Sequence, residues 1–200
     1  MQILTANASF GSKVMSFFTG KDYYKTESGV KISCQRGMGY VQVDEQGKVY
    51  AAGLENATIK GTKNDDNIHV VNSNVNTIYG KKGDDNITIE NSNLNNIYGN
   101  QGRDLVHVVN SNVKGISGGM GDDTVLAQDS HIKHIHGNSG KDTTLTSGGY
   151  TEKVEQGVIF RDNIWVANNP INPNPSEYYK VGTLYENMPE VFGQFLSQSV

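Results

Sequence analysis

The chain has 200 residues, 36% of them apolar, with 23 glycines, four prolines and a formal net charge of −4. This length suits one domain or one repeat array, and the composition is polar without the proline-rich, highly charged character of a disordered chain. The acidic balance gives no indication of a nucleic-acid partner, and no apolar run approaches the ~18 residues of a membrane span. The single cysteine, Cys34, excludes an internal disulfide framework and a cysteine-based zinc site.

Residues 1–40 are expected to form an N-terminal cap. Their start, MQILTANASFGSKVMSFF, has neither a basic n-region nor a continuous apolar h-region, so it lacks the pattern of a cleaved signal peptide. Val49, Ala51 and Ile59 then fall in the register of the repeat that follows, one turn upstream of its first full copy. The stretch from Asp44 to Gly47 in this upstream turn does not match the glycine-aspartate loop of the later copies.

The central part of the chain repeats with a period of 19 residues. Each copy opens with the same glycine: Gly61, Gly80, Gly99, Gly118 and Gly137. The sixth position is always aspartate: Asp66, Asp85, Asp104, Asp123 and Asp142. The fourth position is Asn64 once and otherwise glycine: Gly83, Gly102, Gly121 and Gly140. Asparagine is the next residue most tolerant of a left-handed backbone, so Asn64 is expected to adopt it. A fixed period of this length predicts a solenoid.

The rest of each turn has its own apolar pattern. Aliphatic residues recur at positions 8, 10, 15 and 18, for example Ile87, Ile89, Leu94 and Ile97. Because side chains alternate along a strand, position 12 is also expected to point inward, as a ladder of Asn72, Asn91, Asn110 and Asp129. The serines at position 13 mark the second corner of the turn. The predicted fold is therefore an all-β, right-handed parallel β-roll or β-helix of five 19-residue turns, spanning residues 41–155.

The array is expected to end in atypical units that stop further strand pairing. Thr144, Thr146 and Thr151 replace aliphatic residues in the fifth turn. Residues 156–200 are expected to form a C-terminal cap or export tail, including an amphipathic helix near Met188 to Leu196.

The glycine-aspartate loops have the chemistry of a calcium site. Calcium takes six to eight hard oxygen ligands from carboxylates and main-chain carbonyls. A glycine-rich turn can direct its carbonyls at one point, and the sixth-position aspartate supplies negative charge. One loop alone offers too few ligands, so each ion is expected to lie between two stacked loops, which gives four complete sites for five loops.

The loops resemble the nonapeptide repeats of the repeats-in-toxin proteins, which are calcium-binding β-roll proteins of bacteria exported by the type I route. Gly118 to Leu126 meets the full pattern G-G-x-G-x-D-x-U-x, and the resemblance covers roughly residues 61–145. Only one half of each turn carries a loop, which is similar to the solenoid segment of a bacterial ice-binding adhesin. The resemblance implies a secreted, extracellular, non-enzymatic module with Ca²⁺ as cofactor and a signal-peptide-independent route of export.

The resemblance also implies the ligands. The sixth-position aspartates would bind through their side chains, and the glycines of the loops would present their carbonyls. Position 5 holds Asp65, Asp84 and Asp122 as further candidates, but Arg103 and Lys141 in the other two turns, so we expect it to face solvent.

Three other functions remain open from the sequence. A polysaccharide lyase or epimerase can be built on a parallel β-helix, but no catalytic residues can be named here. A glycan or a protein could be the partner of a binding module. An ice-binding surface would need an outward threonine array, which position 2 lacks. His131, His134 and His136 cluster in the fourth turn, where the pattern fits both a transition-metal site and plain surface histidines.

Overall fold

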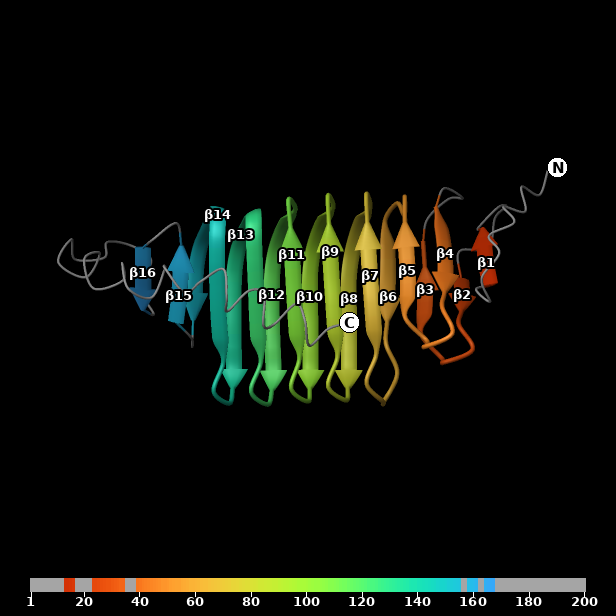
Figure 1. Ribbon diagram of the computed structural model, residues 1–200, viewed down its shortest axis with the longest axis horizontal. Coiled ribbons are helices and arrows are strands. Elements are labelled where there is room, and N and C mark those ends of the chain that lie inside the picture. The colour runs from red at the N-terminus through yellow and green to blue at the C-terminus, as the bar shows by residue number, and fades with distance from the viewer. Residues whose placement is uncertain (1–12, 17–22, 35–38, 156–157, 162–163, 168–200) are drawn as a thin grey trace.

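The computed structural model describes residues 13–16, 23–34, 39–155, 158–161 and 164–167. These residues contain strands and no helix, and they form a parallel β-solenoid of about six turns (Figure 1). None of the described elements is a helix of the length and apolarity needed to cross a membrane. The predicted β-solenoid is confirmed, including the additional turn at Val49 to Lys60 that precedes the glycine-aspartate loops.

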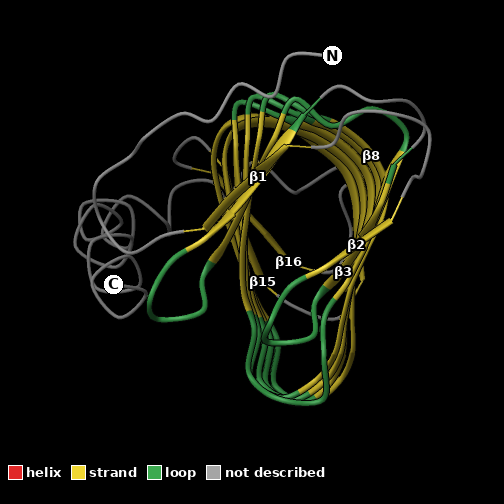
Figure 2. Ribbon diagram, turned by 90° about the vertical axis from the view of Figure 1, so that its right-hand side faces the viewer, coloured by secondary structure: helices red, strands yellow, loops and turns green. Residues whose placement is uncertain are grey.

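Each turn contributes two strands, which stack into two columns of parallel strands. The first column contains β5 (Val49–Ala52), β7 (Asn67–Val71), β9 (Asn86–Glu90), β11 (Leu105–Val109) and the start of β13 (Thr124–Ser139). The second contains β6 (Ala57–Lys60), β8 (Asn74–Lys82), β10 (Asn93–Gln101), β12 (Asn112–Met120) and the rest of β13. The strand β14 (Thr143–Glu155) pairs along both halves of β13. Seen along the stack, the turns superimpose and their connections lie at two edges (Figure 2).

Antiparallel strands flank the parallel array. On the N-terminal side these are β1 (Lys13–Ser16), β2 (Tyr23–Lys25), β3 (Lys31–Ser33) and β4 (Tyr40–Val43). Of these, β3 pairs with β6 and β4 pairs with β5, so both columns end in antiparallel neighbours. On the other side β15 (Val158–Arg161) still pairs with β14 in parallel, and β16 (Ile164–Ala167) then pairs with β15 in antiparallel fashion. The predicted helix near Met188 lies outside the described residues.

The core is a thin layer between the two columns. Ile87, Ile89 and Ile97 are fully buried and Leu94 is nearly so, as the positions 8, 10, 15 and 18 of the repeat predict. Each turn adds a similar set to one continuous cluster. In the fifth turn Thr144, Thr146 and Thr151 are buried at the equivalent positions, which makes that end of the core more polar.

The prediction that the asparagines of position 12 point inward is wrong. Asn72, Asn91, Asn110 and Asp129 are exposed, and each has a positive φ between 44° and 49°. The alternation of the strand ends at position 11. The left-handed backbone at position 12 leaves the asparagine side chain outside, and the serine of position 13 turns inward instead. The column of buried serines consists of Ser73, Ser92, Ser111 and Ser130.

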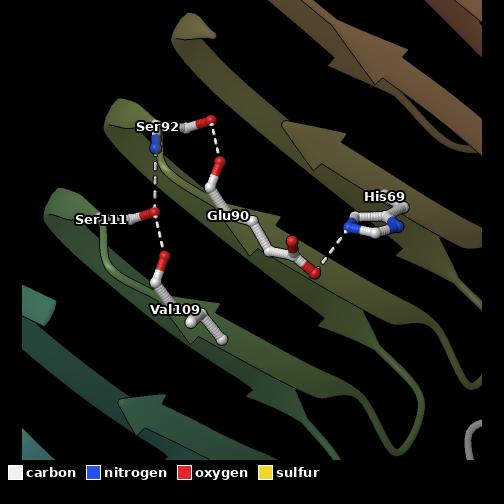
Figure 3. A network of polar contacts seen from close by, with 5 residues as sticks. All are labelled: His69, Glu90, Ser92, Val109 and Ser111. Atoms are coloured by element: carbon white, nitrogen blue, oxygen red, sulfur yellow. Dashed lines mark hydrogen bonds and ion pairs between the residues drawn. The ribbon is translucent and has the colours of Figure 1, made fainter. Parts of the chain in front are cut away.

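The serine column links the turns through hydrogen bonds (Figure 3). Ser92 N donates to Ser111 Oγ at 3.0 Å, and Ser111 Oγ donates to the carbonyl oxygen of Val109 at 2.6 Å. Ser92 Oγ makes the equivalent bond to Glu90 O, and the side chain of Glu90 contacts His69 Nε2 at 3.0 Å. Each serine hydroxyl of the column therefore has both a donor and an acceptor partner within the protein.

Candidate metal centre

The glycine-aspartate loops stack at one edge of the solenoid, the lower edge in Figure 1. They connect the end of one second-column strand to the next first-column strand, for example β8 to β9 through Gly83 and Asp85. The fourth-position glycine has a positive φ in four loops, at Gly83, Gly102, Gly121 and Gly140. A Cβ at Gly102 would also overlap the carbonyl of Gly83, so the close approach of adjacent loops requires glycine there.

The first loop departs from this geometry. Asn64 occupies the fourth position but has no positive φ, so the expectation that asparagine adopts the left-handed backbone there is wrong. Asn64 N instead donates to Thr62 Oγ1 at 3.1 Å in a local turn, a bond that the other four loops cannot make because they have no threonine at position 2. The first loop is thus folded differently from the other four.

The first-position glycines leave room for two oxygens. A Cβ at Gly80 would overlap Asp85 Oδ2 and would lie 2.7 Å from the carbonyl oxygen of Gly99 in the next turn. A Cβ at Gly99 would meet Asp104 Oδ2 and, at 2.5 Å, the carbonyl oxygen of Gly118. A carboxylate oxygen of one turn and a carbonyl oxygen of the next therefore converge on the bare face of each of these glycines. Two negative dipoles or charges directed at one point fit a cation.

The aspartates of position 6 form a buried ladder. In most of them only one carboxylate oxygen accepts a hydrogen bond. Asp66 N donates to Asp85 Oδ1 at 2.8 Å, Asp85 N to Asp104 Oδ1 at 2.9 Å, and Asp104 N to Asp123 Oδ1 at 2.8 Å. Asp123 N continues the ladder to Asp142 Oδ1 at 3.0 Å. The second oxygen, Oδ2, is buried and has no hydrogen-bond partner in Asp85, Asp104, Asp123 and Asp142. An unpartnered buried acceptor is costly, and it is more costly when it carries charge.

The electrostatic environment of the ladder disfavours ionisation. Burial raises the pKa of Asp85 to about 7, of Asp104 to about 6 and of Asp123 to about 7, against an ordinary value of 3.8. Neighbouring aspartates, including Asp84 and Asp122, raise these pKa values further, while the backbone N–H donors lower them. A column of this kind either holds protons or attracts a cation that replaces them.

The position-5 aspartates lie on the outside of the loops. Asp65 Oδ1 accepts from Asp84 N at 2.8 Å, and Asp84 Oδ1 accepts from Arg103 N at 2.7 Å. Asp122 Oδ1 accepts from Lys141 N at 2.8 Å, so all three bind the backbone of the following turn. Their side chains are exposed, and Asp84 also forms a loose ion pair with Arg103 at 3.7 Å.

The histidines of the fourth turn are not brought together as one site. His131 contacts Glu152 at 3.3 Å and His136 contacts Glu155 at 2.8 Å, while the rings of His134 and His136 lie 6.3 Å apart. Among the described residues no group of three or more His, Cys, Asp or Glu side chains is placed to hold a metal. A metal site in the loops would therefore depend on backbone carbonyls as well as on the aspartates.

A groove follows the outside of the second column. Its lining consists mainly of asparagines at the start of successive strands, among them Asn74, Asn93 and Asn112, next to the otherwise buried Val75, Leu94 and Val113. Asn93 Nδ2 donates to Asn74 Oδ1 at 3.1 Å, and Asn112 Nδ2 donates to Asn93 Oδ1 at 3.0 Å, so the asparagines are bonded to one another along the stack. Sequence reasoning did not identify this groove, because it is formed jointly by residues of several turns.

Compared with known proteins, the chain matches no family model, and no curated protein or solved structure matches it significantly. The geometry of the loops is thus the main basis for a functional conclusion.

Proposed function

We propose that this chain binds calcium ions between its stacked glycine-aspartate loops and that these ions stabilise the solenoid. The observation that carries the proposal is the row of buried, unpartnered Oδ2 atoms on Asp85, Asp104, Asp123 and Asp142. A divalent cation beside this row would compensate two neighbouring carboxylates at once and would remove their mutual repulsion. No group within the described loops does so for these four residues.

Calcium is favoured over other metals by the type of ligand that the loops offer. The converging atoms are carboxylate and carbonyl oxygens, for example Asp85 Oδ2 and the carbonyl oxygen of Gly99. Calcium accepts six to eight such oxygens in flexible geometry, whereas magnesium demands a near-ideal octahedron and structural zinc sites use mainly histidine and cysteine. When bound, the ion would supply positive charge. The aspartates and the first-position glycines would hold it, with further loop carbonyls completing the shell.

The resemblance of the loops to repeats-in-toxin sequences supports the same proposal and extends it to a secreted, non-enzymatic module. Extracellular calcium modules have dissociation constants of about 10⁻⁴–10⁻³ M, and such a site would stay empty at cytosolic calcium levels. We therefore propose that the chain folds completely only outside the cell. A calorimetric titration that gave submicromolar affinity would contradict this location.

Calcium-coupled folding is tested with the full chain at pH 7.5. Far-UV circular dichroism should show full β structure in millimolar calcium and a loss of β structure after chelation, and magnesium should not restore it. The matched control is a variant with Asp85, Asp104, Asp123 and Asp142 all changed to asparagine. This variant keeps the Oδ1 acceptors and loses the charges, so its spectrum should not depend on calcium. Identical spectra of the parent with and without calcium, or a calcium response in the variant, would contradict the proposal.

A further inference from the structure

The first aspartate of the ladder differs from the other four in having partners for both oxygens. Thr62 N donates to Asp66 Oδ2 at 2.5 Å, and Thr62 Oγ1 donates to Asp66 Oδ1 at 3.3 Å. Asp66 is buried, with 7% of its surface exposed, yet it is not among the aspartates with an unpartnered Oδ2. Asp66 therefore has local donors that the other four aspartates lack, while its Oδ2 and the carbonyl oxygen of Gly80 converge on the bare face of Gly61 as in the later loops.

A positive charge also lies beside this first loop. The ammonium group of Lys81, a half-buried residue at position 2 of the second loop, donates to the carbonyl oxygen of Gly61. The lysine side chain thus reaches from the second loop back to the first. Its positive charge is thereby held at the loop that contains Asp66.

The backbone at Lys81 indicates that this lysine is present for its side chain. Position 2 is left-handed in four loops, with φ of +93° at Lys81, +84° at Asn100, +126° at Gly119 and +78° at Asn138. Glycine and asparagine tolerate this conformation, whereas lysine does not favour it. Residues held in unfavourable backbone conformations are concentrated at functional sites. At Lys81 the side chain has such a function in its contact with Gly61.

We propose that the Lys81 ammonium is a built-in cation that takes the place of calcium between the first and second loops. The array then has three calcium sites, between the loops of Asp85, Asp104, Asp123 and Asp142, instead of four. It also has one end that needs no metal. In a stack where each turn contacts only its neighbours, an ordered end provides a template on which calcium-bound turns add in sequence. The inference rests on the proposed calcium binding.

The number of bound ions tests the inference. Native mass spectrometry of the full chain in calcium should show three ions for the parent and four for Lys81→Asn. Asparagine is the residue of the third and fifth loops at this position, so the variant suits the backbone. The matched control is Lys82→Asn, which removes the same charge from an exposed neighbour and should retain three ions. Four ions on the parent, or three on Lys81→Asn, would overturn the inference alone; no ions on the parent would overturn the calcium proposal as well.

Hydrogen exchange provides a second measurement that needs no metal. After chelation, β7 and β8 in the parent should exchange more slowly than β11 and β12. Lys81→Met, which keeps the aliphatic stem and loses the charge, should remove this difference. Uniform exchange along the metal-free parent, or unchanged protection in Lys81→Met, would overturn the role of Lys81 as a tethered cation.

Discussion

Replacing Asp104 with asparagine separates the two roles of this side chain in the middle of the array. Asp104 Oδ1 accepts the 2.9 Å hydrogen bond from Asp85 N, and an asparagine retains an oxygen for this bond. The unpartnered Oδ2 becomes an amide nitrogen, so the shape is kept and the charge is lost. The variant therefore tests the charge without opening a cavity or breaking the ladder.

Asp104→Asn should raise the free energy of unfolding without calcium and lower it with calcium. Burial raises the pKa of Asp104 from 3.8 to about 6, which corresponds to about 3 kcal/mol of unfavourable free energy in the ionised, metal-free state. The uncharged amide of Asp104→Asn carries no such penalty, so the metal-free variant should be more stable than the parent by up to about 3 kcal/mol at pH 8. In calcium the variant lacks an anionic ligand shared by two sites, so its calcium affinity should fall by at least about tenfold, or 1.4 kcal/mol.

Urea denaturation with calcium and with chelator measures both effects, and calorimetric titration measures the affinity. Arg103→Ala is the adjacent control, because its 3.7 Å pair with Asp84 is exposed and such pairs contribute about 0–1 kcal/mol. Arg103→Ala should change neither the free energy of unfolding nor the calcium affinity much. The reasoning is refuted if Asp104→Asn binds calcium like the parent, or if it destabilises the metal-free protein.

Two further predictions concern pH and the backbone. The pKa values of Asp85, Asp104 and Asp123 are raised in the folded state, so their contribution to the stability of the metal-free protein should be fully present below about pH 4 and should be lost as pH rises through 6 to 7. In saturating calcium the melting temperature should instead rise over this upper range, because protons compete with the metal; a flat metal-free profile would contradict the assignment. Asn91 has a φ of +49°, so Asn91→Gly should be tolerated, whereas Asn91→Val should cost about 1–2 kcal/mol by thermal melting. Equal melting temperatures of these two variants would argue against a left-handed corner.

The strands and the core could be predicted from the sequence because they depend on the alternation of inward and outward side chains along each strand, which recurs in every repeat. Ile87 and Ile89 share one face of β9, and the same pair of positions is buried in its neighbours. For the same reason, one wrong assignment of side-chain direction recurs in every turn. Extending the alternation one residue too far, to Asn91, places every position-12 side chain on the wrong side. The signal for the correct interpretation is an asparagine followed by a serine at a corner, since asparagine tolerates a positive φ.

The details of the candidate site could not be predicted in the same way, because they are contacts between turns. Nothing local to Asp104 indicates that its Oδ1 would bind the backbone of the preceding loop while its Oδ2 remains without a partner. Likewise, the contact of Lys81 with Gly61 joins residues 20 positions apart and depends on the stacking distance of the loops. The sequence identifies which residue types face this edge, and the structure determines which of their atoms are used.

The two edges of the solenoid differ in whether the side chains that link the turns are fully paired. At the serine edge, Ser111 Oγ accepts from Ser92 N and donates to Val109 O, so a hydroxyl that is both acceptor and donor leaves nothing unpaired. At the aspartate edge, Asp104 Oδ1 accepts from Asp85 N in an equivalent bond between turns, but a carboxylate is an acceptor only. Its second oxygen therefore needs a donor or a cation from elsewhere. The choice of aspartate over serine at this corner thus confines any dependence on a ligand to one edge of the stack.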